Sequence, residues 1–475
     1  MKEINLTSLV NSHGVMAMVP TINKSIDGIL QYCSENGIQF IDLKSVDLCG
    51  RLRHISLPVS EVSEKSLSEG IGFDGSGYGF LEVESSDLVE IPDLATVVVD
   101  PFRQAATLSV FANIHLTDSK RTRFELDPRY ICSKAELLLR RLEIADDLLV
   151  GPEYEFYLFA SVGFSTTGNS SYYSIEYVED FEWNTYHAAN PFDKYDDFRD
   201  EATQLMKSLG IATKYHHHEA GRKGQQEIET TFNPLLETAD QSVLIRYLLY
   251  NLAERHNIRL TFMPKPIYGE AGSGWHIHQF LRKNGKNIFY DENGPASLSE
   301  VGLYYIGGLL KHAPSLCAFT NPSTNSYKRL LPGFEAPTVM SFGRSNRSAA
   351  VRIPSYVSDP QELRFEYRPP DGTANPYLAL SAMLLAGIDG IQNKYDPIAE
   401  GLGPSEQRNA GDLKKVKFLP QTLDDALDAL QKDHEYLLRD KVFDNMLIER
   451  WIGIKRREAS AIAARPHPFE FPLYF

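Results

Sequence analysis

The segment Val150-Gly-Pro-Glu-Tyr-Glu-Phe-Tyr-Leu158 alternates acidic and apolar side chains with a period of two residues. In an extended strand successive side chains point to opposite faces, so Glu153 and Glu155 share one face and the apolar side chains share the other. The pattern predicts an antiparallel strand with one buried apolar face and one polar face.

Three later segments show the same alternation: Gln226-Glu-Ile-Glu-Thr-Thr-Phe232, Gly274-Trp-His-Ile-His278 and Leu363-Arg-Phe-Glu-Tyr-Arg368. Any one polar face could simply be solvated. Solvated strand faces usually mix Thr, Ser, Lys and Glu, whereas these carry chiefly carboxylate, imidazole and guanidinium groups. The groups concerned are Glu227 with Glu229, His276 with His278, and Arg364 with Glu366 and Arg368.

This set of side chains predicts a metal and phosphate site. Clustered carboxylates repel one another unless cations neutralise them, and carboxylates with one or two imidazoles suit Mg²⁺ or Mn²⁺. Arginine matches the geometry of phosphate groups. Phosphoryl transfer needs both metals and fixed positive charge.

Two further segments, both expected as loops, favour the same chemistry. His216-His-His-Glu219 precedes Gly221-Arg-Lys-Gly224, and its alternative interpretation is a solvated loop. Ser341-Phe-Gly-Arg-Ser-Asn-Arg347, followed by Arg352, is a basic cluster whose alternative is a salt-bridged surface.

The composition is that of a globular protein without nucleic-acid or membrane partners. The 475 residues are 43% hydrophobic and 23% charged, with a net charge of −15, and an acidic surface repels phosphate backbones and anionic membranes. The longest strongly apolar stretch, around residues 378–388, is too short to span a bilayer, and no secretory signal is visible. The four scattered cysteines favour reduced thiols, so we expect a cytoplasmic protein.

The order of the elements predicts an α+β protein with a small first domain and a larger second one. Residues 22–36 show helical spacing, and short strands are expected at 39–43, 51–57 and 95–100. Further helices are expected after the Asp127-Pro128 start signal and after the capping box at Thr422-Leu-Asp-Asp425. The predicted division is an extension at 1–21, a domain at 22–116 and a domain at 117–475.

The common sequence motifs of nucleotide-binding proteins and hydrolases do not indicate another function. Gly70-Ile-Gly-Phe-Asp-Gly75 matches GxGxxG, but no apolar strand precedes it and no clear helix follows. P-loop, GxSxG and HExxH motifs do not occur.

At these residues the chain resembles the bacterial-type glutamine synthetases over nearly its whole length. The matching segments, in chain order, are Val46-Asp47-Leu-Cys-Gly50, Phe73-Asp-Gly-Ser76, Gly151-Pro-Glu-Tyr-Glu155, His217-His-Glu219 to Glu227, Met263-Pro-Lys-Pro266, Gly272-Ser-Gly-Trp-His276, Asn325-Ser-Tyr-Lys-Arg329, Gly333-Phe-Glu-Ala-Pro337, Asn346-Arg347, Asn375-Pro-Tyr377 and Arg465-Pro-His-Pro-Phe-Glu-Phe. Together these segments are highly specific.

The resemblance implies a fold and an assembly. It implies a β-grasp N-terminal domain, then a catalytic domain with a curved antiparallel sheet, packed helices, a C-terminal helical segment and a strap. The subunits would form a homo-oligomeric double ring, a dodecamer, with active sites between neighbouring subunits.

The resemblance also implies the ligands of the site, which are two or three Mg²⁺ or Mn²⁺ ions, ATP, glutamate and ammonium. One metal would be held by Glu155, Glu219 and Glu227, and the other by Glu153, His276 and Glu366. Glutamate would be held by Glu155, Gly272, Arg329 and Arg368, and ammonium by Asp47, Tyr186 and Glu219. The resemblance places five residues around ATP: Arg347, Arg352, Arg364, Phe232 and His278.

The implied activity is that of a ligase of nitrogen metabolism, which makes glutamine from glutamate and ammonium. ATP would phosphorylate the side-chain carboxylate of glutamate, and ammonia would attack the γ-glutamyl phosphate. Asp47 of a neighbouring subunit would take the ammonium proton, Arg347 would act at the phosphoryl group, and Glu335 would close the site against water.

Two departures from the family's sequence pattern leave open which amine is the substrate. Ala271 stands where the family usually has an asparagine that contacts glutamate, and Phe280 replaces a usual serine near the nucleotide. A lost polar contact is worth about 0.5–1.5 kcal/mol. The alternative is a γ-glutamyl ligase for a larger amine, such as a polyamine or ethanolamine. A non-catalytic structural or regulatory homologue is a remote third possibility, since all six candidate metal ligands are present.

Overall fold

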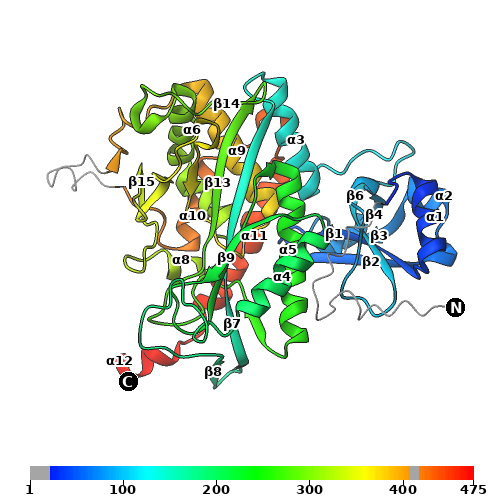
Figure 1. Cartoon of the computed structure of the whole chain (residues 1–475), viewed down its shortest axis with the longest axis horizontal. Helices are drawn as coiled ribbons and strands as arrows, with labels where there is room; N and C mark the ends of the chain where they lie inside the picture. The colour runs from blue at the N-terminus through cyan, green and yellow to red at the C-terminus, as the bar shows by residue number, and fades with distance from the viewer. Residues whose placement is uncertain (1–21, 406–416) are drawn as a thin grey trace.

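The chain folds around two β-sheets that lie side by side, a small one near the N-terminus and a large one (Figure 1). The computed structural model describes residues 22–405 and 417–475. The extension expected at residues 1–21 therefore lies outside the described residues. The mixture of sheets and helices confirms the predicted α+β class.

The small sheet has the strand order β2-β1-β6-β4-β3, with β5 beside β6. Strand β1 pairs antiparallel with β2 and parallel with β6. The strands are β1 Phe40–Val46, β2 Leu52–Pro58, β3 Ile71–Asp74, β4 Asp87–Pro92, β5 Val98–Val99 and β6 Thr107–Leu116.

Two helices, α1 Ile26–Asn36 and α2 Glu64–Glu69, complete this part of the chain. Helix α1 begins four residues later than expected because the Ser25 side chain accepts from the Gly28 N–H as N-cap, and it buries Ile29 and Cys33. The strand expected at 95–100 is only partly correct, since a 3₁₀ turn occupies Leu94–Thr96 and leaves only β5.

The large sheet has the order β15-β16-β17-β13-β7-β10-β9, with β8, β11 and β12 paired to β7 and β14 to β13. All four alternating segments of the sequence form strands in it, within β7, β10, β13 and β17. The strands are β7 Asp147–Thr166, β8 Ser171–Tyr177, β9 Thr213–His218, β10 Gln225–Thr230, β11 Asn233–Pro234, β12 Arg259–Thr261, β13 Trp275–Lys283, β14 Lys286–Asn287, β15 Val339–Arg344, β16 Ala349–Ile353 and β17 Phe365–Tyr367.

Helices cover the apolar face of the large sheet. Tyr154, Ile228 and Trp275 belong to the main core, and the Tyr154 hydroxyl lies 2.7 Å from Ser242 Oγ on α5. The helices of this part of the chain, of which α12 is exposed and does not cover the sheet, are α3 Pro128–Arg141, α4 Asp196–Ser208, α5 Leu235–Arg255, α6 Glu300–Lys311, α7 Ala313–Thr320, α8 Ser326–Arg329, α9 Pro376–Asn393, α10 Leu423–Lys432, α11 Asn445–Ala463 and α12 Phe471–Tyr474. The helix starts predicted at Asp127 and Thr422 are both confirmed as N-caps.

Helix α9 is the most buried helix of this layer and needs glycine to fit. A Cβ at Gly308 of α6 would lie 2.0 Å from the Ala386 carbonyl oxygen of α9, so only glycine allows the two helices to approach this closely. None of the described helices is long and apolar enough to cross a membrane. The four cysteines are free.

A buried guanidinium joins the small sheet to the helices of the large one. Arg129 on α3 binds the Asp240 carboxylate of α5 at 2.9 Å, Asn113 Oδ1 of β6 at 2.6 Å and Asp93 Oδ2 at 2.9 Å. Since the pair is buried and fully hydrogen-bonded, it holds the two sheets in one relative position.

Candidate active site

The register of the large sheet brings the polar faces of its strands into rows. Residues directly opposite one another on paired strands lie about 5 Å apart, so each row is a line of neighbouring side chains. One row runs His217, Glu227, Glu155; the next runs Tyr215, Glu229, Glu153, His276; a third runs His278, Glu366, Arg352.

All of these side chains except Glu229 and His278 line a cavity of about 620 Å³ on the face of the sheet away from the covering helices. A second cavity, of about 410 Å³, adjoins it and shares Glu155, Glu219 and His276. The predicted site residues that line the first cavity are Glu153, Glu155, Tyr186, Glu219, Glu227, His276, Glu335, Arg347, Arg352, Glu366 and Arg368, while Gly272 and Arg329 line the second.

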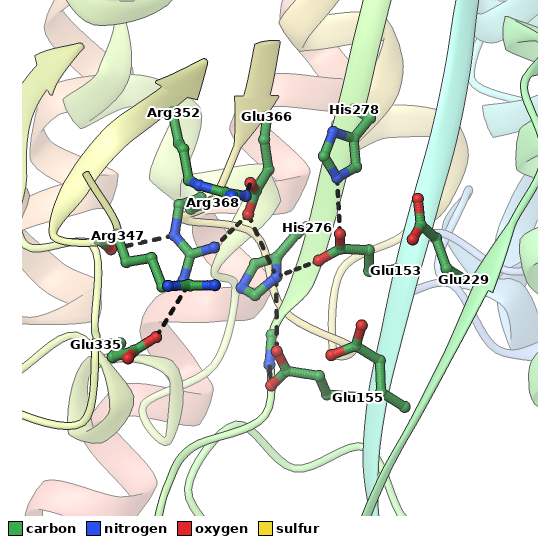
Figure 2. A network of polar contacts seen from close by, with 12 residues as sticks. Glu153, Glu155, Glu229, His276, His278, Glu335, Arg347, Arg352, Glu366 and Arg368 are labelled. Carbon is green, nitrogen blue, oxygen red and sulfur yellow. Dashed lines mark hydrogen bonds and ion pairs between the residues drawn. The ribbon is translucent and has the colours of Figure 1, made fainter. Parts of the chain in front are cut away.

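The first cluster of possible metal ligands is Glu153, His276 and Glu366, from β7, β13 and β17 (Figure 2). One ligand atom from each lies within 4.8 Å of the others, and His276 Nδ1 is 2.8 Å from Glu153 Oε2 and 3.7 Å from Glu366 Oε1. Burial opposes ionisation of Glu366, but Arg368 beside it lowers the pKa of this carboxyl to about 2. Likewise, burial opposes ionisation of Glu153, but His278 and His276 hold its pKa well below the usual range.

The second cluster is His217, Glu219 and Glu227. His217 lies on β9, Glu219 directly follows that strand, and Glu227 lies on β10. His217 lies 3.6 Å from the Glu219 carboxylate and 3.5 Å from that of Glu227. Burial raises the pKa of Glu219 and Glu227 well above the usual range, and the neighbouring carboxylates raise it further. The buried Glu219 Oε2 has no hydrogen-bond partner.

Both clusters fit divalent cations. A buried, repelling pair of carboxylates with an unsatisfied oxygen and a nearby imidazole is stabilised by a hard cation such as Mg²⁺ or Mn²⁺. Glu155 stands between the clusters: its Oε1 lies 3.5 Å from His276 Nδ1, and its Oε2 accepts from the Gly274 N–H at 2.7 Å.

Two other clusters that contain acidic side chains are already neutralised by a lysine or an arginine side chain. Lys214 Nζ lies 2.6 Å from Glu229 Oε1, beside Glu153 and His278. The cluster of Asp196, Asp200 and His216 contains the Arg199 guanidinium, which contacts His216 Nδ1 at 3.1 Å.

Four predicted residues do not line these two cavities. His278 is fully buried behind Glu153, and its Nε2 lies 2.7 Å from Glu153 Oε1, so it supports a ligand from behind. The Arg364 guanidinium lies 5.4 Å from the ring of Phe232, and Phe232 packs against Phe280 at 5.3 Å.

The fourth of these residues, Asp47, lies on the turn after β1. Its carboxylate accepts from the Arg51 N–H at 2.9 Å and from Arg53 Nη2 at 2.7 Å. Asn375 donates to the Leu48 carbonyl at 3.1 Å, and Gly50 has φ +88°, with no room for a Cβ against Asn375. The turn is therefore held rigidly against the start of α9.

Glu335 lies on a strained loop at the rim of both cavities. Gly333, Phe334 and Glu335 all have positive φ, at 109°, 51° and 57°, which is costly for the two non-glycine residues. Arg347 Nε lies 3.3 Å from Glu335 Oε2, and both side chains are largely exposed (Figure 2). Exposed ion pairs are weak, so this contact can open.

Some cavity residues were missed by sequence reasoning, and part of the reason is a wrong element. The histidine run was expected to be a loop, but residues 213–218 form β9, and 341–344 of the basic cluster lie in β15. Tyr215, His217 and Glu219 alternate with period two, which is the signal that could have found this face. The missed lining residues include Glu182, Asn184, His187, Tyr215, Glu270 and Tyr356.

Fold and site together define an α+β enzyme scaffold in which one largely antiparallel sheet carries a cleft of carboxylates, imidazoles and arginines. The sequence matches the family model of the glutamine synthetase β-grasp domain at residues 37–117 and that of the catalytic domain at 125–474. The chain belongs to the glutamine synthetase family and is an enzyme of the ligase class.

Individual relatives agree over the full length. The chain is 43% identical to a glutamine synthetase of Streptomyces filamentosus, over 95% of this chain and 99% of that protein. It is similar to the solved Plasmodium falciparum glutamine synthetase, with a TM-score of 0.86 and 26% identity over 96% of this chain and all of the other. It is also similar to GmaS solved in an ADP complex, with a TM-score of 0.79 and 27% identity over 94% and 98% of the two chains.

Proposed function

We propose that this chain joins ammonium to the side-chain carboxylate of glutamate at the expense of ATP, and so makes glutamine. The observation that carries the proposal is the meeting of two carboxylate–imidazole clusters with Arg347, Arg352 and Arg368 in one cavity. Membership of the glutamine synthetase family supports the same reaction.

At least two Mg²⁺ or Mn²⁺ ions belong to this proposal. Glu153, His276 and Glu366 would hold one, and Glu219 and Glu227 with His217 or Glu155 would hold the other. Bound there, the ions would neutralise the phosphate oxygens of ATP.

The substrates would occupy the two adjoining cavities. Arg347 and Arg352 lie at the first cavity, where their forks suit the phosphates of ATP, with Arg364, Phe232 and His278 behind its wall. The solved ADP complex of the similar GmaS supports nucleotide binding on this fold. Glutamate would lie in the second cavity against Arg329, Gly272, Arg368 and Glu155.

The reaction would follow in two steps. The glutamate carboxylate attacks the terminal phosphorus of ATP, ADP leaves, and Arg347 balances the charge of the transferring group. Glu219 and Tyr186 hold ammonium at the same cavity, and Asp47 of the partner subunit takes its proton. Ammonia then displaces phosphate from the γ-glutamyl phosphate while the loop of Glu335 excludes water.

The assembly proposed is a double-ring dodecamer in the cytoplasm, with each site shared by two subunits. Two observations support it. Asp47 does not line the cavities of its own chain. The C-terminal end exposes a run of large apolar side chains that a second subunit would cover: Phe469, Phe471, Leu473, Tyr474 and Phe475.

A larger amine is the second candidate acceptor, because Ala271 lies in the second cavity with no polar side chain to offer. Phosphate release with ATP, Mg²⁺ and glutamate, measured while the amine is varied, separates the two. Turnover with ammonium supports the main proposal. Turnover with ethanolamine or a polyamine but not with ammonium assigns the chain to the second candidate, and no turnover with any amine contradicts both.

A further inference from the structure

The segment 179–187 brings three side chains to the first cavity although it contains no helix or strand. It follows β8, and Asn184, Tyr186 and His187 line the cavity beside Glu219. His187 has a φ of 57°, a conformation that a non-glycine residue keeps only when its surroundings hold it. The contacts that hold this segment therefore decide where Tyr186 lies.

A buried pair provides the first contact. Glu179 and His218 both have fully buried side chains, and His218 Nε2 contacts Glu179 Oε1. On the other side of the ring, His218 Nδ1 lies 2.7 Å from the carbonyl oxygen of Glu219 and donates to it. The two nitrogens of the His218 ring thus connect the Glu179 carboxylate to the backbone carbonyl of Glu219.

A second contact reaches the same peptide from the same segment. The fully buried Thr185 donates its hydroxyl to the Glu219 carbonyl at 3.0 Å. The His187 N–H donates to the carbonyl of His218 at 3.0 Å. The peptide groups on both sides of Glu219 are therefore hydrogen-bonded to segment 179–187.

The rings of this segment complete the arrangement. His187 stacks on Tyr186 with centroids 4.0 Å apart, and it lies 4.4 Å from the ring of His217. Tyr186 and Glu219 consequently face one cavity from two segments that cannot shift independently.

We propose that Glu179 and Thr185 are positioning residues that fix the separation of Tyr186 and Glu219 and thereby select ammonium over larger amines. This inference rests on the proposed function, which places ammonium at those two side chains. Neither Glu179 nor Thr185 lines either cavity. Loosening their contacts widens the space between Tyr186 and Glu219, which weakens the hold on a small cation and admits a larger one.

Four variants of the full-length chain test the proposal. Glu179→Leu removes the partner of His218, and Thr185→Val removes one hydrogen bond at constant shape. Loss of such buried hydrogen bonds corresponds to an increase of about tenfold in the KM for ammonium, with a smaller change in kcat. Glu179→Gln keeps a hydrogen-bonding group and should restore the KM to within about threefold of the parent. Glu176→Leu, at an exposed position of β8 outside the segment, is the matched control and should change nothing.

The ratio of kcat/KM for ammonium to that for methylamine should fall in Glu179→Leu and Thr185→Val and stay constant in Glu176→Leu. The proposal is overturned if both of the first two variants keep the parent's ratio and its KM for ammonium. If Glu179→Leu does not fold, Thr185→Val alone decides. This variant should fold, because valine has nearly the shape of threonine and the Glu219 carbonyl keeps its hydrogen bond from His218.

A fluorescence measurement separates this proposal from the proposed function. Among the three tryptophans, Trp183 lies in the segment and is 45% exposed, whereas Trp275 and Trp451 are buried. Quenching by acrylamide therefore reports on Trp183. If the parent protein uses no ammonium, the proposed function has failed, and quenching decides the positioning role alone: an increase in Glu179→Leu but not in Glu176→Leu supports it, and equal quenching overturns it.

Discussion

Glu366 is completely buried and still ionised, because the guanidinium groups of Arg352 and Arg368 contact its two oxygens. It lies opposite both His278 and Arg352 in the sheet, so it belongs to the metal cluster and to the arginine side of the cavity at once. A single carboxylate thus sets the charge of two parts of the site.

Replacement of Glu366 tests this double role. In Glu366→Gln we expect kcat/KM for glutamate to fall at least about 100-fold, because a metal ligand is lost. We also expect a loss of about 3 kcal/mol in the free energy of unfolding, since two buried guanidiniums lose their counter-charge. Phosphate release and urea denaturation measure the two effects. The exposed Glu362→Gln is the control, and retained activity in Glu366→Gln would show that the metal assignment is wrong.

Glu219 and Glu227 make metal binding depend on pH. Burial, followed by the neighbouring carboxylates, raises the pKa of both, so they keep protons in the folded, cation-free protein at a pH where the unfolded chain has lost them. The folded state then binds more protons, and its stability without cations falls as pH rises above about 4.5, the ordinary pKa of the unfolded carboxyls. Mg²⁺ must displace these protons, so its affinity rises with pH.

Calorimetric titration with Mg²⁺ in two buffers of different ionisation enthalpy measures this proton release directly. We expect protons to be released near pH 6 and the thermal midpoint to rise more with Mg²⁺ at pH 8 than at pH 5. An equal heat in both buffers would contradict the assignment of these carboxylates to a cation.

At the scale of elements, alternation identifies strands that have neighbours on both sides more readily than strands at an edge. Strands β7, β10 and β13 are paired on both sides and bury one apolar face, so their sequences must alternate. Strand β9 pairs only with β10 at the edge of the sheet, and its residues 214–216 are Lys-Tyr-His. An edge strand need not bury an apolar face: the residues between Tyr215, His217 and Glu219 are histidines, and for want of an apolar face the segment was expected to be a loop.

Strand β4 carries a buried glutamate whose ionisation destabilises the folded protein. Glu90 is fully buried, and burial raises its pKa to about 7, although Ser45 and Tyr78 hydrogen-bond to it. The unfolded chain ionises near pH 4.5, so the folded state loses stability between pH 4.5 and 7 and keeps that loss above pH 7.

Glu90→Gln should therefore stabilise the protein at high pH. The shift corresponds to about 3 kcal/mol at pH 8, and no gain is expected below pH 4.5, where both side chains are neutral. Thermal unfolding at the two pH values measures the difference, with the exposed Glu84→Gln as control. An equal gain at both pH values would point to a packing effect instead.

At the scale of the whole molecule, the small sheet is fixed to the large one by Arg129 and by the contact of Asn375 with the turn of Asp47. Asp47 is therefore held in a fixed position, and it lines neither cavity of its own chain. This placement makes a shared active site testable without a structure of the assembly.

Mixing of two inactive proteins tests the sharing. Asp47→Asn and Glu366→Gln should each be inactive alone, whereas co-assembled subunits should recover activity. In a random equimolar mixture about a quarter of the sites combine an intact Asp47 with an intact Glu366 from different subunits. Co-expression and phosphate release measure the recovery. No recovery in a mixed oligomer of normal size would show that each site is built within one chain.

The sequence by itself determined four strands of the site (β7, β10, β13 and β17), the residue types on their polar faces and the family, because alternation and motifs are local properties of the chain. Only the tertiary structure decided that His217 stands with Glu219 and Glu227, that His278 supports Glu153 from behind, and that Glu179 pairs with His218 across 39 residues. These relations depend on the register between paired strands and on the path of irregular segments. Both are set by long-range packing, which a one-dimensional pattern does not contain.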